Sequence, residues 1–153
     1  MVRPTMPLPR IPSFIGFSFL RESNKEFWEY FEQSTKAAPT AREKLLAFFA
    51  ALQDYVISPA CYGCPFINVA SEFPEADYAG HQVALEHKQA VRVRFTQLAK
   101  EAGAHRPEAL ANALLLLMDG AYMAARMYGA SPGNPAANVV EAARQVIDAQ
   151  CET

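Results

Sequence analysis

The chain has 153 residues and a net charge of −2, with 51% hydrophobic and 20% charged side chains. That length favours one domain with its own core, and the balanced charge offers no basic face for nucleic acid. The three cysteines, an odd number, fit a reducing cytoplasm better than a disulfide framework. No segment favours a signal peptide or a membrane span.

Prolines and helical periodicity divide the chain. Residues 1–12 hold four prolines, which exclude a helix and predict a disordered arm ahead of one domain over residues 13–153. Within that domain the apolar residues recur at helical spacing, without strand-like alternation or an internal repeat. Helices are predicted over 13–36, 40–57, 65–73, 77–103, 107–129 and 136–150. The expected fold class is all-α, a single bundle of about six helices.

The predicted helix 107–129 holds the longest apolar run. Pro107 suits its first turn and Gly129 suits its end. A helix that is apolar nearly all round must be covered by its own protein, by a partner subunit or by lipid. Asp119 interrupts the run, which argues against lipid. This carboxylate is either a functional polar group, or it reaches a rim or the N-terminus of a neighbouring helix, and both readings stay open.

Cys61-x-x-Cys64 is the sharpest local motif. It is typical of a redox pair or of half a metal site. A structural zinc needs about four ligands, and no second such motif or nearby histidine pair exists. All-α thiol peroxidases would want a histidine at position 68, where this chain has Asn68. We therefore favour the reading in which Cys64 starts a helix and Cys61 lies in a loop, and we predict neither a metal nor a cofactor.

His87 falls on the apolar face of the predicted helix 77–103. Such a histidine binds a ligand or metal, senses pH, or is a core residue bonded to a backbone carbonyl. No phosphate-cradling loop, HExxH motif or paired-carboxylate helix accompanies it. The absence of a catalytic set favours a protein that is not an enzyme.

The order of segments resembles a known family. GCPFINVASEFP is followed by a long helix with ALEHKQAVRVRF, by PEALANALLLLMDGAYMAAR and by a last Ala/Val-rich helix. Over roughly residues 20–150 this is similar to the C-terminal regulatory domain of TetR-family transcriptional repressors. Glu86-His87-Lys88 and Asp119-Gly120 carry much of the match.

The resemblance implies a homodimer built by the last two long helices and a small apolar or aromatic effector held inside the domain, with His87 or Tyr122 as its polar handle. The implied dimer residues are Ala113, Gly120, Ala124, Val139, Ala143, Val146 and Ile147. The implied effector-binding residues are Phe49, Phe66, Phe73, His87, Leu115, Met118 and Tyr122.

The family reads operator DNA with an N-terminal helix-turn-helix domain. Residues 1–19 are too short and too rich in proline to hold one, so DNA binding by this chain alone is not expected. The alternative is an all-α thiol oxidoreductase or redox sensor that uses Cys61 and Cys64.

Overall fold

The computed structural model describes residues 13–151, so the predicted arm over residues 1–12 lies outside the described part. The all-α prediction is confirmed. No β-strand occurs between residues 13 and 151, where one isolated β-bridge joins Ala104 to Cys151. The elements are α1 (Ser13–Thr35), α2 (Ala41–Val56), α3 (Pro65–Glu72), α4 (Ala79–Glu101), α5 (Pro107–Tyr128), the 3-10 helix η1 (Pro135–Asn138) and α6 (Val139–Gln150).

Local chemistry sets most helix ends where the sequence predicts them. The Thr40 side chain accepts the Glu43 N–H at 3.2 Å and caps α2. Gly129 ends α5 with a φ of 61°, which other residues rarely adopt. One prediction is wrong in detail: residues 135–138 form the 3-10 helix η1 rather than a turn of α-helix. The Asn134 side chain caps this tighter turn by accepting the Ala136 N–H.

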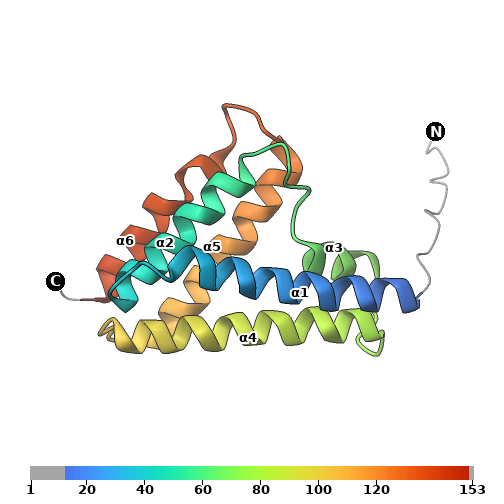
Figure 1. Ribbon diagram of the computed structural model, residues 1–153, viewed down its shortest axis with the longest axis horizontal. Helices are drawn as coiled ribbons and strands as arrows, with labels where there is room; N and C mark the ends of the chain where they lie inside the picture. The colour runs from blue at the N-terminus through green and yellow to red at the C-terminus, as the bar shows by residue number, and fades with distance from the viewer. Residues whose placement is uncertain (1–12, 152–153) are drawn as a thin grey trace, which may run out of the picture.

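The helices form two groups (Figure 1). The long helices α1 and α4 run side by side, and short α3 lies against both near the start of α4. The second group, α2, α5 and α6, packs across the other end of that pair. The two groups of helices meet at an aromatic cluster, in which Phe48 and Phe49 of α2 contact Phe95 of α4. All three side chains are fully buried.

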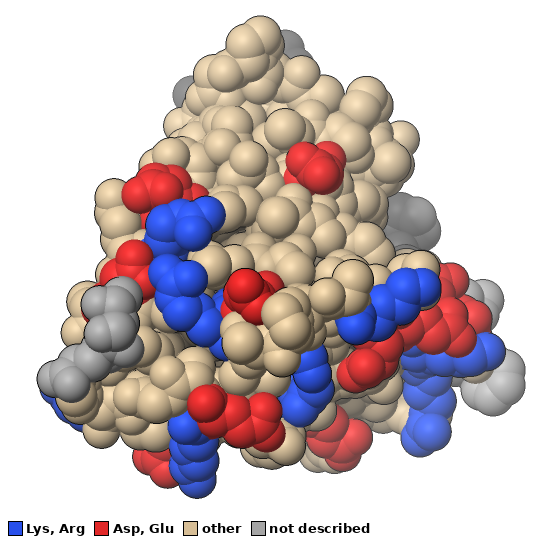
Figure 2. Space-filling model, turned by 60° about the vertical axis from the view of Figure 1, so that its left-hand side comes forward, with Lys and Arg blue, Asp and Glu red and all other residues tan. Residues whose placement is uncertain are grey.

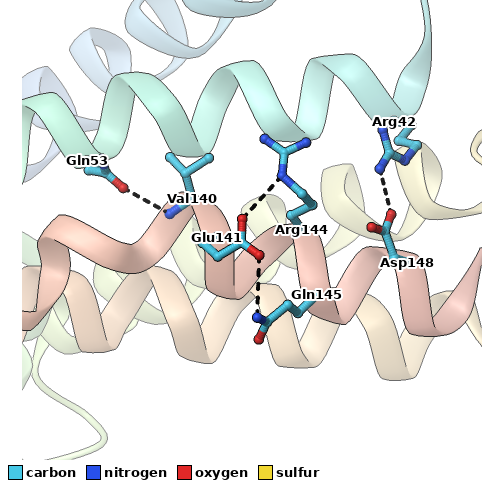
Figure 3. A network of polar contacts seen from close by, with 7 residues as sticks. All are labelled: Arg42, Gln53, Val140, Glu141, Arg144, Gln145 and Asp148. Carbon is cyan, nitrogen blue, oxygen red and sulfur yellow. Dashed lines mark hydrogen bonds and ion pairs between the residues drawn. The ribbon is translucent and has the colours of Figure 1, made fainter.

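Polar contacts hold α6 against α2 at both ends (Figure 3). The Val140 N–H in the first turn of α6 donates to the Gln53 side chain at 3.1 Å, which satisfies one of the amides that helix starts leave unpaired. At the other end, Arg42 pairs with Asp148. These contacts fix how α6 lies along α2.

One face of α5 lies in the core and the opposite face is open. Leu114 and Met118 are fully buried, whereas Leu116 is 71% exposed and Met127 is 74% exposed. On the face drawn in Figure 2, charged side chains gather in the lower part of the molecule. The upper part of this face carries very few charged side chains. It lies at the height where Figure 1 places the C-terminal half of α5 and the start of α6. The chain by itself therefore covers only half of its most apolar helix.

Candidate functional site

Five helices meet around a cavity of about 290 Å³, which we call the aromatic cavity. Its volume is near the lower end of the range for small-molecule sites, roughly 300–1,000 Å³. Six of its twelve lining residues carry aromatic or imidazole rings. The lining residues are Ser23, Glu26, Phe27, Tyr30, Tyr55, Gly63, Cys64, Pro65, Phe66, His87, Lys88 and Tyr122.

Helix α1 contributes a mixed polar and aromatic stripe to this wall. Ser23, Glu26, Phe27 and Tyr30 recur at three- or four-residue spacing and so share one face of the helix. None of these four residues is among the effector-binding residues that the family resemblance implies. The spacing itself is the signal that could have found them, since it borders the apolar stripe that ends in buried Phe31.

His87 lies in the wall and is held on three sides. Its ring stacks on Phe66 with centroids 3.7 Å apart and planes 5° apart, and Phe27 meets it edge-on at 4.7 Å. Its Nδ1 lies 2.8 Å from the Asn24 side-chain oxygen on α1. Because that oxygen can only accept, Nδ1 carries the proton. Burial, followed by the neighbouring charge of Lys88, lowers the pKa of His87 to about 3.

This neutral histidine predicts a pH dependence of stability. In the unfolded chain the pKa of His87 is about 6.5, so below that pH the unfolded state takes up a proton that the folded state does not. The stability that the neutral ring contributes is complete above about pH 6.5 and is lost as the pH falls toward 3. Between about pH 6.5 and 5 we expect the wild type to lose about 1.5 kcal/mol more than His87→Phe, which keeps the stacked ring. Urea unfolding at both pH values measures this, and equal losses in the two proteins would refute it.

Lys88 joins α4 to α5 and to the start of α3. Its ammonium pairs with Asp119 Oδ1 at 2.5 Å and lies 3.5 Å from Cys64 Sγ. The Lys88 side chain is 16% exposed and that of Asp119 31% exposed, so the pair is partly desolvated. Asp119 thus pairs with a side chain from the interior of α4 rather than with a helix N-terminus.

Burial holds the pKa values of three tyrosine phenols and of the Cys61 thiol above their ordinary values. Burial, helped by the charge of Asp54, raises the pKa of Tyr30 to about 12. Burial also raises the pKa values of Tyr55, Cys61 and Tyr122. A raised thiol pKa disfavours the thiolate that redox chemistry needs, so Cys61 gives no support to a thiol oxidoreductase. All three cysteines are free.

Comparison with known proteins decides the family. Residues 41–143 match the model of the tetracyclin repressor-like C-terminal domain. The chain belongs to this TetR family. No curated protein matches the sequence.

Two solved structures are similar to the TetR-type domain described here. The TetR-family transcriptional regulator SCO4454 from Streptomyces coelicolor superposes with a TM-score of 0.82 at 22% identity, over 90% of this chain and 71% of that one. A putative TetR transcriptional regulator (sav143) from Streptomyces avermitilis gives a TM-score of 0.79 at 25% identity, over 90% and 74% of the two chains.

The TetR-type domain brings three of the seven implied effector residues to one cavity: Phe66, His87 and Tyr122. The other four do not line it. Phe49 and Met118 are fully buried in the core, Phe73 stacks on Tyr78, and half-buried Leu115 packs against the core. Helical spacing predicts which residues share a face of a helix, but it does not predict how neighbouring helices are offset along one another. That offset decides whether an inward-facing side chain lies in the core or lines the cavity.

The implied dimer residues also separate into two sets. Gly120 is exposed, and a groove of about 220 Å³ between α5 and α6 runs beside Gly120 and half-buried Ala124. Ala113 and Val146 are half-buried. The rest lie in the domain's own core and leave almost no surface for a partner: Val139, Ala143 and Ile147.

No group of three or more acidic, histidine or cysteine side chains in residues 13–151 is arranged to hold a metal ion. Within the same residues, no helix is long and apolar enough to cross a membrane.

Proposed function

We propose that this TetR-family chain is a homodimerising regulatory domain whose aromatic cavity binds a small aromatic effector. The observation that carries the proposal is the cavity itself, which is lined by five helices and by six aromatic or imidazole rings. A concave, mostly apolar pocket with a few convergent polar groups is the usual form of a small-molecule site. Its volume suits a ligand of one or two fused rings.

Exposed apolar surface on α5 supports the homodimer. Leu116, Met123, Met127 and Tyr128 are each at least 44% exposed. Contiguous apolar patches of this kind mark interaction surfaces. The first three lie with Gly120 at positions i, i+4, i+7 and i+11, on one face of the helix. Pairing of this face and α6 with the same elements of a second copy would give a symmetric four-helix interface.

The position of the cavity suggests how binding is transmitted. Helices α1 and α4 lie side by side (Figure 1), and both line the cavity. A ligand that binds one arrangement of these helices more tightly shifts the population toward it. Operator DNA is read, on this proposal, by a helix-turn-helix unit outside the described helices.

Calorimetric titration with 2-naphthol as the probe tests the cavity. Ser23→Trp places an indole at the cavity wall, where we expect it to weaken binding by at least about tenfold, which corresponds to about 1.4 kcal/mol. Glu22→Trp is the matched control, because Glu22 is exposed and does not line the cavity. Equal affinities of the Ser23→Trp variant and the wild type would contradict the assignment.

A further inference from the structure

His87 has one nitrogen that the protein does not use. Nδ1 donates to the Asn24 side chain, and among the residues that the structure describes no partner of Nε2 is present. The side chain is only 3% exposed, yet no fully buried side-chain nitrogen or oxygen among residues 13–151 lacks a partner. An unpartnered Nε2 is therefore accessible rather than sealed in the core.

Two hollows border His87: the aromatic cavity and a second one between α1 and α4. Asn24 lines the second hollow but not the aromatic cavity. Because Nδ1 is bonded to Asn24, Nε2 is the ring nitrogen that is left for the aromatic cavity. Phe66 and Phe27 hold the ring in this orientation.

The proton on Nδ1 fixes the chemistry of Nε2. In a neutral imidazole with Nδ1 protonated, Nε2 carries a lone pair and can only accept a hydrogen bond. The lowered pKa of His87 agrees with a neutral ring. Lys88, which follows His87 in the sequence and also lines the cavity, already donates to Asp119 and Cys64, so it is a weaker candidate for the polar contact with a ligand.

We infer that the effector is an aromatic compound with an O–H or N–H donor that binds Nε2 of His87, an inference that rests on the proposed function. A ligand without an O–H or N–H group, such as an ether or an anion, cannot donate to Nε2. The lone pair of Nε2 would then stay unpaired or would meet a second lone pair on the ligand. A site with an unpaired polar group discriminates against analogues that cannot pair it.

Three naphthalene probes of similar shape test the inference: 2-naphthol, 2-methoxynaphthalene and 2-naphthoate. We expect 2-naphthol to bind about tenfold more tightly than 2-methoxynaphthalene, and 2-naphthoate to bind no better than the ether. In His87→Phe, which keeps the ring stack and removes the acceptor, the preference for 2-naphthol should disappear.

Equal binding of the naphthol and the ether by the wild type overturns the inference but leaves the aromatic site standing. Tighter binding of 2-naphthoate assigns the contact to Lys88 instead. Failure of all three to bind overturns both proposals.

Nitrogen-15 spectra of the wild type provide a readout that does not depend on the variant. The His87 ring should show a protonated Nδ1 and a bare Nε2. The Nε2 resonance should move on addition of 2-naphthol and move less with 2-methoxynaphthalene. A protonated Nε2, or equal shifts with the two compounds, contradicts the inference.

Discussion

Gly120→Leu is expected to dissociate the proposed homodimer while leaving each subunit folded. A Cβ built at Gly120 meets no atom within 4 Å, so a single chain has room for the new side chain. The residue is helical, and replacing glycine by leucine inside a helix is favourable by roughly 0.5–1 kcal/mol. If the exposed face of α5 packs on a second copy, the leucine would clash at its centre. We expect the dimer dissociation constant to rise at least about a hundredfold, or about 2.7 kcal/mol.

Light scattering over a range of concentrations, together with thermal unfolding, measures both effects. Gln89→Leu adds the same side chain at an exposed position of α4 and should leave the dimer intact. Two results would show that this face of α5 does not form a dimer interface. One is a wild type that stays monomeric, and the other is a Gly120→Leu variant that dimerises as well as the control.

Phe95→Ala is expected to lower the free energy of unfolding by about 3–5 kcal/mol, the usual cost of removing a buried phenylalanine ring. Phe95 is fully buried, and its centroid lies 5.7 Å from that of Phe48 and 6.0 Å from that of Phe49. The ring therefore joins α4 to α2, and its loss leaves a cavity between the two groups of helices. Since a domain is typically stable by about 5–15 kcal/mol, the variant should be close to unfolding.

Val93→Ala is the matched control, because Val93 lies two residues away on the same helix and is 68% exposed. We expect it to change stability by no more than about 0.5 kcal/mol. Urea unfolding followed by circular dichroism gives both values. A loss at Phe95 as small as that at Val93 would mean that the aromatic cluster does not join the two groups.

The helices could be predicted because their signals are local. The Thr40 cap, Pro107 at a first turn and Gly129 at an end each act within a few residues. The apolar faces of α5 could also be predicted from helical spacing. Which of these faces the rest of the chain buries could not be predicted. Leu114 and Met118 face the core only because α2, α4 and α6 pack on that side.

The site depends on pairs that the sequence cannot place together. Asn24 and His87 are 63 residues apart, and Lys88 and Asp119 are 31 apart. Each pair forms because neighbouring helices pack in one register, which helical periodicity does not specify. Periodicity did place His87 on an inward face, but it could not supply Asn24, and the Asn24 contact decides which nitrogen carries the proton.

Sedimentation velocity of the wild type with 2-naphthol tests the central claim most directly, because it reports assembly and binding together. The absorbance is followed at a wavelength where the probe absorbs and the protein does not. A homodimeric domain with an aromatic site predicts that the probe co-sediments with a species of twice the 16.9 kDa mass of one chain. A single-chain species, or a probe that stays behind while the protein sediments, would contradict the account.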